Sequence, residues 1–566
     1  MMQMAETDAD AEVDQTQAVL RSSALMAVGT ITSRITGVAR DITIAAALGS
    51  FILADTYALG NSLPNIIYIL VIGGALNAVF IPQLIRHMKH DADGGDGYAD
   101  RLITLVGLIL LVTSIATVLL APWIVKFYAT SEFSSEELSL ATAFARFCLP
   151  QIFFYGIYTM FSQVLNSRLH FGAPMFAPII NNVVMIATAI GFIWVAGTAV
   201  SAETITPDQV AWLGIGTTLG VAAQALVLVP VLIRVGYRWR PRFDFRGHGL
   251  GKAGSLAGWT IGLVLVNQIG FLVISRLATL SNVIASDTGG TAQGLATYQR
   301  AFLVFMLPHS VITISLVTAL LPRMSKAAAD GRMREVGQDV AEGSRLIGAF
   351  IVPCVTFLMA FGPMVGLVLF GFGSNSGDPA IYTGLVVSCF AIGLLPFSLF
   401  YVMLRGYYSM EDTRTPFIVT VLYNVLSIPL TIALFLLAPD SLKVVALAVG
   451  YALSYWVIAA VTWLLLRRRI GYLEGRRTAG ALSRMVLAGI LAAAIALALV
   501  LAGYAALAGV GLDDSLSRLL DHHIASLIAV IVGGILTVLL YLAFALMLRV
   551  SEVRRALGDV RARVRR

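Results

Sequence analysis

The chain has 566 residues, of which 58% are hydrophobic and 13% charged, and its formal net charge is +7. Soluble globular proteins are about 45–50% apolar and about 25% charged, so this composition excludes a soluble protein. The apolar runs are too long for the alternating segments of roughly ten residues that build a membrane barrel. The sequence therefore predicts an all-α polytopic membrane protein.

Fourteen apolar runs are long enough to cross a bilayer as helices at about 1.5 Å per residue. We expect them near residues 24–49, 58–86, 102–126, 138–164, 174–199, 209–234, 255–280, 293–321, 340–370, 381–407, 416–438, 443–466, 482–508 and 520–548. Most of the 39 Lys and Arg residues fall in alternate loops or after the last run. Because basic loops stay inside, this asymmetry predicts that both termini are cytoplasmic. It also accounts for the positive charge without nucleic acid.

The first run carries Ser33, Arg34, Gly37, Arg40 and Asp41 near its middle. An arginine at the centre of a membrane helix costs roughly 2.5–3.5 kcal/mol, so it has to face water, protein or an anion. At 100° per residue these side chains form one polar face. We predict that the face lines a cavity for an anionic group, with Asp41 neutralising the arginines when the cavity is empty. Arginines anchored at the membrane interface, or a fixed Arg–Asp pair, are the alternatives.

A repeat indicates two lobes in the same orientation. Leu149-Pro150 recurs as Leu395-Pro396, Asn182-Val183 as Asn424-Val425, and Pro82 as Pro322, at a nearly constant offset. Both copies begin after an even number of helices, so the repeat is parallel. Its copies predict two six-helix lobes and two extra C-terminal helices. The expected segments are a disordered cytoplasmic tail 1–23, an N-lobe 24–237, a basic linker 238–254, a C-lobe 255–470, a terminal helix pair 471–550 and a basic tail 551–566.

Arg300 lies within the eighth run and would add a third guanidinium to a cleft between the lobes. Guanidinium groups bind phosphate oxygens in a bidentate manner and stay charged. Asp55, at the mouth of the second run, is expected to be solvated. The sequence contains no phosphate loop, nucleophile motif or metal-ligand spacing, so we expect neither an enzyme nor a metal site nor a cofactor.

Several motifs together resemble the MurJ (MviN) family of bacterial lipid II flippases. They are Ser33-Arg34-x-x-Gly37-x-x-Arg40-Asp41, Leu63-Pro64-Asn65, Gly74-Ala75-Leu76 and Asn166-Ser-Arg-Leu-His-Phe-Gly-Ala-Pro174. The resemblance extends over about residues 24–470. It implies the MOP-superfamily fold, with the terminal helix pair forming a groove for a polyprenyl tail. The implied substrate is lipid II, carried across the cytoplasmic membrane for peptidoglycan synthesis.

The resemblance also assigns roles to individual residues. Arg34, Arg40 and Arg300, with Ser33, fall on the substrate-binding positions, and Asp41, with Gly37, on the gate. Where other members have an arginine and a glutamate on the second helix, this chain has Tyr68 and Gly73. A monovalent cation site of some members has Asp412 and Asn424 as its only candidates here. Coupling to such a cation or to the membrane potential, a monomeric state and contact with the cell-wall synthesis machinery are further expectations.

Three other functions remain as alternatives. A flippase for another polyprenyl-pyrophosphate-linked glycan would need the same arginines. A multidrug antiporter of the same superfamily would need acidic cation-binding residues within the lobes. A scaffold of wall synthesis that transports nothing would need no arginines at the membrane's middle.

Overall fold

The computed structural model describes residues 28–73, 93–168, 170–244, 258–291, 293–555 and 558. Twelve helices of this part of the chain are long and apolar enough to cross a membrane. The predicted all-helical membrane class is therefore confirmed, and the count of fourteen spans stays a prediction. The predicted runs 24–49 and 58–86 are helical over residues 28–48 and 52–73. The rest of those two runs lies outside the described residues, as do the N-terminal tail and residues 245–257 of the linker.

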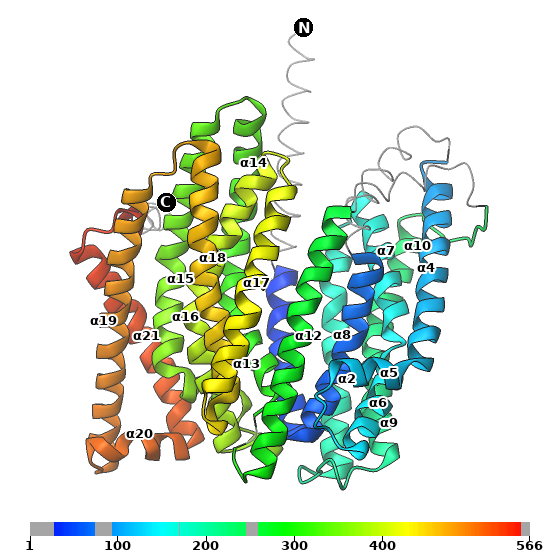
Figure 1. The fold of residues 1–566 in the computed structure, drawn as a ribbon, viewed down its shortest axis with the longest axis horizontal. Helices are drawn as coiled ribbons and strands as arrows, with labels where there is room; N and C mark the ends of the chain where they lie inside the picture. The colour runs from blue at the N-terminus through cyan, green and yellow to red at the C-terminus, as the bar shows by residue number, and fades with distance from the viewer. Residues whose placement is uncertain are drawn as a thin grey trace. The chain divides into compact units, whose positions relative to one another are not determined.

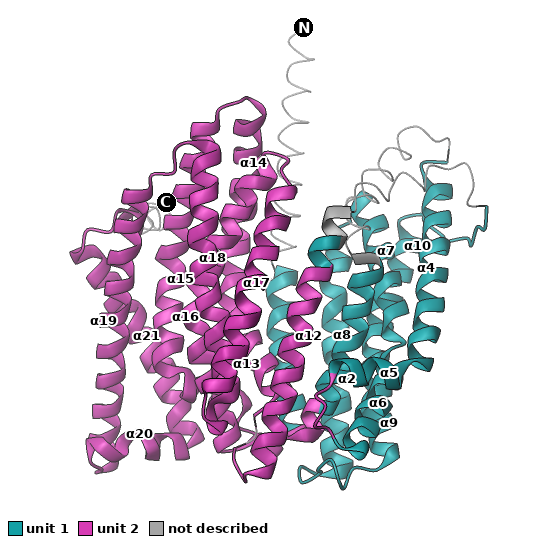
Figure 2. Ribbon diagram, viewed as in Figure 1, with its two compact units in different colours: residues 1–47, 56–128, 134–264 teal, residues 48–55, 129–133, 265–566 magenta. Residues whose placement is uncertain are grey.

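The chain forms two compact units, shown in Figure 2. Unit 1 comprises residues 1–47, 56–128 and 134–264, and unit 2 comprises residues 48–55, 129–133 and 265–566. The boundary between the units thus lies close to the predicted end of the basic linker. Two short segments of the N-terminal half, 48–55 and 129–133, nevertheless belong to unit 2.

Unit 1 is a bundle of long helices and a few short ones. After the first helix, residues 28–48, these are α2 (Ile52–Tyr68), η1 (Ile69–Gly73), α4 (Asp96–Leu119), α5 (Ala121–Tyr128), α6 (Ser135–Cys148), α7 (Gln151–Ser167), α8 (Gly172–Ala196), α9 (Pro207–Leu226) and α10 (Leu228–Arg234). Ser134 and Thr206 begin α6 and α9 with reciprocal capping boxes. These caps satisfy N–H groups that the helix itself leaves unpaired.

Unit 2 contains longer helices, visible in Figure 1. They are α12 (Gly258–Asp287, from residue 265 on), α13 (Leu295–Pro308), η3 (His309–Thr313), α14 (Ile314–Ala329), α15 (Met333–Phe370), α16 (Asp378–Ser409), α17 (Arg414–Leu437), α18 (Lys443–Ile470), α19 (Gly475–Ala508), α20 (Leu512–Asp521) and α21 (His523–Met547). The terminal pair α19 and α21 packs together and against α15. The short helix α20, which the sequence analysis missed, joins the pair.

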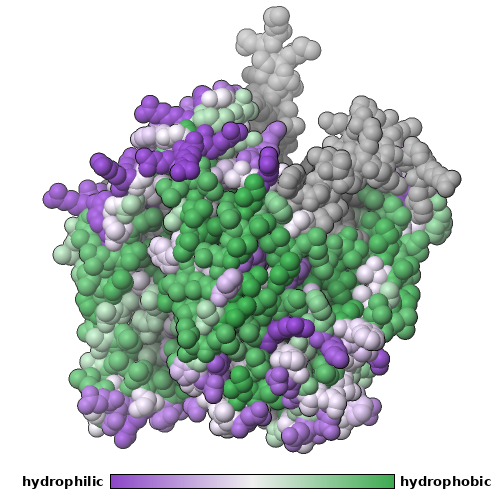
Figure 3. Space-filling view, viewed as in Figure 1, coloured by the Kyte–Doolittle hydropathy of each residue, from purple (hydrophilic) through white to green (hydrophobic). Residues whose placement is uncertain are grey.

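The space-filling view in Figure 3 shows hydrophobic side chains along the helices and hydrophilic ones gathered at both ends. Many large apolar side chains are accordingly exposed, for example Trp194 at 89% and Leu507 at 91%. Such exposure is typical of a lipid-facing surface, where lipid replaces a protein core.

Two helices contain a turn of π-helix at corresponding places of the repeat. These turns, Ile69–Gly73 and His309–Thr313, are separated by the same number of residues as Pro82 and Pro322. Pro308 immediately precedes the second turn, and its missing N–H disrupts the regular hydrogen-bond ladder. Because π-turns are rare, their recurrence at this spacing is a structural feature that the two copies of the repeat share.

Glycines allow α15 and α16 to approach closely. A Cβ on Gly384 of α16 would lie 2.1 Å from the carbonyl oxygen of Gly362 on α15. A Cβ on Gly366, one turn further along α15, would lie 2.4 Å from the backbone nitrogen of Gly384. Gly362 and Gly366 have the small-xxx-small spacing that brings membrane helices together, so this pair is held by backbone packing.

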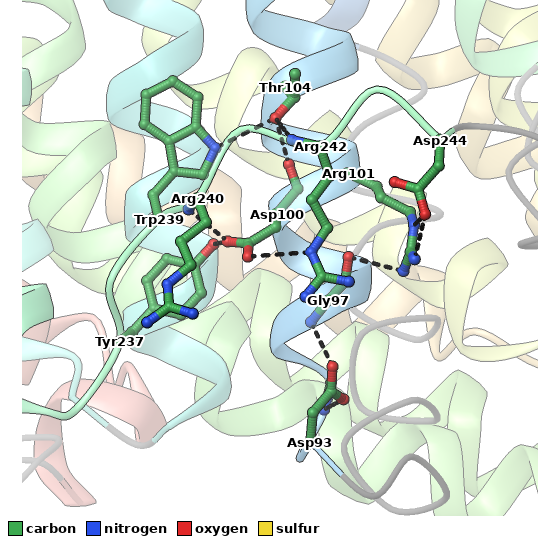
Figure 4. A network of polar contacts seen from close by, with 11 residues as sticks. Asp93, Gly97, Asp100, Arg101, Thr104, Tyr237, Trp239, Arg240, Arg242 and Asp244 are labelled. Carbon is green, nitrogen blue, oxygen red and sulfur yellow. Dashed lines mark hydrogen bonds and ion pairs between the residues drawn. The ribbon is translucent and has the colours of Figure 1, made fainter.

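The segment after α10 is tied to the start of α4 by a polar network, shown in Figure 4. Asp100 of α4 is 3% exposed, and its Oδ1 accepts hydrogen bonds from the Tyr237 hydroxyl at 2.8 Å and from the Arg240 backbone N–H at 3.1 Å. Arg101 of the same helix pairs with Asp244 at 2.6 Å. Burial and the hydrogen bond to Asp100 raise the pKa of Tyr237, so this hydroxyl remains a donor.

Candidate functional site

The residues of the predicted polar face of the first helix belong to unit 1. Arg34 is exposed, and Ser33, Gly37, Arg40 and Asp41 are half-buried. No hydrogen bond or ion pair joins the guanidinium of Arg34 to another described residue. Among the described residues Arg34 thus has no ionic partner, and a second cation, Arg40, follows six residues later on the same helix.

Arg40 and Asp41 form a two-point ion pair. Arg40 Nε donates to Asp41 Oδ1 at 3.0 Å, and Arg40 Nη2 donates to Asp41 Oδ2 at 3.1 Å. The side chains retain 27% and 22% of their exposure. Parallel N–H···O bonds of this kind are the strongest arrangement available to a guanidinium. Asp41 therefore occupies the two-donor edge of the Arg40 guanidinium.

Asn182 on α8 holds this part of the helix, and the sequence analysis did not count it among the site residues. Its Oδ1 accepts a hydrogen bond from Arg40 Nη1 at 3.2 Å. Its Nδ2 donates to the Ser33 carbonyl at 3.1 Å and to Thr36 Oγ1 at 2.9 Å. Asn182 is 5% exposed, so one buried amide fixes both the backbone and the guanidinium. Asn182 occupies the same position in the first copy of the repeat as Asn424 does in the second, and this correspondence could have identified it from the sequence.

Gly37 lies beside the same amide. A Cβ added to Gly37 would lie 3.7 Å from Asn182 Nδ2, which is an ordinary contact distance. The close approach of the first helix to Asn182 therefore tolerates alanine, and a gating role for Gly37 stays a prediction.

Arg300 of α13 is 7% exposed and lies within unit 2. Its Nη2 donates to the Gly49 carbonyl at 2.5 Å, and its Nη1 donates to Ser50 Oγ at 2.7 Å and to Asn375 Oδ1 at 3.3 Å. In this conformation the guanidinium fastens residues 49–50 to α13. Three of the five N–H donors of the guanidinium are therefore used by these protein acceptors.

Asp55 also belongs to this attachment, and the expectation that it is solvated was wrong. The side chain is fully buried, and its two oxygens accept hydrogen bonds from the backbone N–H groups of Leu295 at 3.0 Å and Ala296 at 2.8 Å. These N–H groups begin α13, where the helix dipole favours a carboxylate. Gly294 leaves room for it, since a Cβ there would lie 2.0 Å from Asp55 Oδ2.

Asp412 and Asn424, the two candidates for a cation site, bind different partners, and the site stays a prediction. Asp412 lies just before α17 and accepts hydrogen bonds from the Thr415 backbone N–H at 2.9 Å and hydroxyl at 2.6 Å. Asn424 lies on α17 itself, roughly 15 Å along the axis from the start of the helix at Arg414, at about 1.5 Å per residue. It is 6% exposed, and its Nδ2 donates to the Thr420 carbonyl at 3.0 Å. In the described part of the chain, no three His, Cys, Asp or Glu residues cluster as metal ligands would.

Tyr68 and Gly73, the two departures on the second helix, lie at the π-helical turn. The Tyr68 hydroxyl donates to Thr159 Oγ1 at 2.8 Å, and its ring lies 5.9 Å from that of Tyr155. Gly73 is the last residue of η1. Where the family resemblance leads us to expect an arginine, this chain therefore has Tyr68, an uncharged side chain that joins α2 to α7.

The sequence of this chain is similar to the sequences of one protein family. The sequence matches the family model described as "Lipid II flippase MurJ" over residues 44–510. It is 25% identical over 457 residues to a probable lipid II flippase MurJ of Rhizobium meliloti, covering 79% of this chain and 81% of that protein. It is 28% identical over 415 residues to the lipid II flippase MurJ of Burkholderia cenocepacia, covering 71% and 77%.

Solved structures show the same fold. A lipid II flippase MurJ in an inward closed conformation superimposes with a TM-score of 0.70 at 18% identity, covering 93% of this chain and 99% of that one. An inward-facing multidrug-resistance MATE transporter of the MOP superfamily gives a TM-score of 0.62 at 17% identity, covering 81% and 99%. The family match begins after Arg40 and Asp41, so their roles depend on the local motif and on the contacts described above.

Proposed function

The chain belongs to the Lipid II flippase MurJ family, and on that premise we propose that it moves lipid II from the inner to the outer leaflet of the cytoplasmic membrane by alternating access. The observation that carries the proposal is the family match over residues 44–510. This family is one of transporters rather than of catalysts, which agrees with the absence of an enzyme motif from the sequence.

We propose that Arg34 and Arg40 receive the pyrophosphate. Arg34 is exposed and Arg40 is half-buried in its pair with Asp41. A pyrophosphate carries more charge than one carboxylate and matches the guanidinium fork, so it competes with Asp41 for Arg40. Release of Asp41 from Arg40 then distinguishes the occupied site from the empty one. Such a difference is needed because a ligand shifts a conformational equilibrium only by binding one state better.

Arg300 is proposed to bind substrate in a different conformation from this one. Its present acceptors are Ser50, Asn375 and the Gly49 carbonyl. Exchange of one acceptor for a phosphate would loosen residues 49–50 from α13. Binding and conformational change would thereby be coupled through one side chain.

The terminal helices are proposed to hold the lipid tail. An apolar cavity of about 240 Å³ lies among α16, α18 and α19, and Trp456, Trp463 and Leu482 are among its lining residues. A polyprenyl chain gains free energy at roughly 25 cal/mol per Å² of buried apolar surface, so a groove here would retain the tail while the headgroup crosses.

Further parts of the proposal follow from charge and topology. We propose that both termini lie in the cytoplasm and that the chain acts as a monomer beside the wall-synthesis machinery. Cations in the transport path make the cycle sensitive to the membrane potential, since one charge crossing it is worth about 2.3 kcal/mol per 100 mV. Coupling to a monovalent cation is part of the proposal, with Asp412 and Asn424 as its candidate residues.

The test is to deplete the protein in its own cells and measure whether lipid II becomes accessible from outside. Complementation with the wild-type chain should restore accessibility, whereas Arg34→Ala and Arg40→Ala should not, at equal membrane levels. Arg518→Ala, on the surface helix α20, is the matched control. Continued crossing of other lipid-linked glycans in depleted cells separates lipid II from the alternative substrates. Lipid II exposure that is unchanged by depletion would refute the proposal.

A further inference from the structure

The loop between α15 and α16 contains a buried asparagine that the sequence analysis did not consider. Asn375 is the last residue of the short helix η4 (Gly373–Asn375) and is fully buried. Its Nδ2 donates a hydrogen bond of 2.9 Å to the carbonyl of Phe370, the last residue of α15. The carbonyls at a helix end have no partner within the helix, so this bond helps to cap α15 and fixes the orientation of the amide.

The oxygen of the same amide belongs to a closed triangle of hydrogen bonds. Asn375 Oδ1 accepts from Ser50 Oγ and from Arg300 Nη1, the latter at 3.3 Å. Ser50 Oγ in turn accepts from the same Nη1 at 2.7 Å. All three residues are at most 7% exposed, and all belong to unit 2. Because the groups are buried, the loss of one weakens the positioning of the other two.

The loop also contacts the backbone beside Ser50. Gly49 has a φ of +68°, and a Cβ on it would lie 3.0 Å from the carbonyl oxygen of Ser374. The Gly49 carbonyl accepts a hydrogen bond of 2.5 Å from Arg300 Nη2. Residues 49–50 therefore contact both the loop and Arg300, and Asn375 joins these two partners to each other.

The three acceptors just described for Arg300 are uncharged: an amide oxygen, a hydroxyl and a backbone carbonyl. A phosphate oxygen adds a negative charge to the hydrogen bond and matches the guanidinium fork, so it is a stronger acceptor than any of them. Arg40, by contrast, is paired with a carboxylate. The acceptors of Arg300 therefore compete less strongly with an oxyanion than Asp41 does at Arg40.

We propose that Asn375 is a positioning residue for Arg300. It holds the guanidinium on residues 49–50 while the substrate site is empty, and it releases Nη1 when the pyrophosphate binds. This inference rests on the proposed function, which makes Arg300 a ligand of the pyrophosphate. Asn375 itself touches no substrate, but its side chain sets how readily Arg300 leaves residues 49–50.

A purely structural role for Asn375 leads to a different expectation. A side chain that only capped α15 would stabilise the loop and leave the affinity of Arg300 for an anion unchanged. Loss of a positioning residue should instead raise that affinity, because Nη1 loses a competing acceptor. The direction of a change in binding therefore distinguishes the two roles.

The experiment titrates the purified full chain in lipid nanodiscs with pyrophosphate by isothermal calorimetry. Asn375→Leu keeps the approximate size of the side chain but removes the acceptor, and it should tighten pyrophosphate binding about two- to tenfold, the value of one hydrogen bond. In an Arg300→Ala background the same substitution should change nothing, because the guanidinium through which it acts is absent. Ser376→Ala, at the next and exposed residue of the loop, is the matched control and should bind as the wild type does.

Hydrogen–deuterium exchange is the second measurement. Exchange of residues 48–55 should rise in Asn375→Leu and stay at the wild-type level in Ser376→Ala, since only the first releases residues 49–50. Unchanged or weaker pyrophosphate binding by Asn375→Leu would overturn the proposal, as would an equal gain in the Arg300→Ala background or equal exchange in the two loop variants. Should Asn375→Leu fail to fold, Asn375→Ala takes its place in both measurements.

Lipid II accessibility in cells is measured separately for each variant. Transport by the wild type without an Arg300-dependent effect of Asn375 would refute the positioning role alone. The expected effect of Asn375 on pyrophosphate binding, in a chain that does not move lipid II, would refute the proposed function alone. Failure of the wild type to bind pyrophosphate would overturn the positioning role and the proposed part of Arg300 together.

Discussion

Arg40 on the first helix donates a hydrogen bond to Asn182 on α8, with 3.2 Å between Nη1 and Oδ1. The same asparagine binds the Ser33 carbonyl and Thr36, so it orients the guanidinium and anchors the helix that carries it. Unit 2 contains a counterpart, because Asn424 on α17 lies against Gly270 of α12. In each unit, an asparagine of a later helix contacts the unit's first long helix.

The first prediction concerns this asparagine. Asn182→Ala should lower the free energy of unfolding by about 1–3 kcal/mol and reduce transport, because it removes the hydrogen bonds to the Ser33 carbonyl, the Thr36 hydroxyl and the Arg40 guanidinium. Thermal unfolding in detergent and lipid II accessibility in cells measure the two effects. The neighbouring Asn181→Ala is the control, since Oδ1 of Asn181 has no hydrogen-bond partner among the described residues. Equal effects of the two substitutions would contradict the role of Asn182.

The second prediction separates charge from geometry at Arg40. Arg40→Lys keeps the positive charge but loses the planar fork, so transport should fall at least about tenfold, the value of roughly 1.4 kcal/mol. Asp41→Asn should instead tighten the binding of pyrophosphate, since it removes the competing carboxylate, and should slow the cycle. Isothermal titration with pyrophosphate and the accessibility assay measure these effects. A fully active lysine variant would argue against bidentate binding.

The third prediction tests the close approach of α15 and α16. Gly384→Ala places a methyl group against the backbone of Gly362 and should cost about 1–3 kcal/mol of stability, as overpacking does. Gly480→Ala on α19 meets no atom within 4 Å and should be neutral or slightly stabilising. Thermal unfolding of the two variants in the same detergent compares them directly. The packing explanation fails if Gly384→Ala is as stable as Gly480→Ala.

The fourth prediction concerns the cap of α13. Asp55→Ala removes the acceptor of two buried N–H groups and should destabilise the protein by about 1–3 kcal/mol. Asp55→Asn keeps an acceptor but loses the negative charge and should be intermediate. Asp378→Asn, at the exposed start of α16, should change stability by less than about 0.5 kcal/mol. Denaturation midpoints of all three variants decide whether Asp55 is a buried cap.

The fifth prediction is a pH dependence at Asp412. Burial raises its pKa, but hydrogen bonds from Thr415 and the Arg414 backbone N–H, together with the charge of Arg469, outweigh this effect, so the pKa lies below its usual value. A carboxyl group whose pKa is lowered by folding stabilises the protein above the unfolded pKa of about 3.9, and the stabilisation is lost as the pH falls through the folded pKa. Asp412→Asn should therefore be less stable than the wild type at pH 7, with the difference shrinking at pH 3. A difference that does not depend on pH would exclude an ionised Asp412 as its cause.

The sequence by itself determined the helical membrane class, most span positions, the repeat and the family resemblance. These features depend on local properties: an apolar run is recognised by its length, and a proline or asparagine recurs at a fixed offset. Even the paired π-helical turns keep the spacing of Pro82 and Pro322.

Only the tertiary structure decided what each polar side chain contacts. Asp55 caps a helix 240 residues further along the chain, Arg300 holds residues 49–50, and Asn182 binds Arg40. The depth of a charged residue in a span indicates that it needs a partner, but several acceptors far apart in the sequence could supply one. The choice among them depends on which helices pack together, and no local pattern of residues encodes that packing.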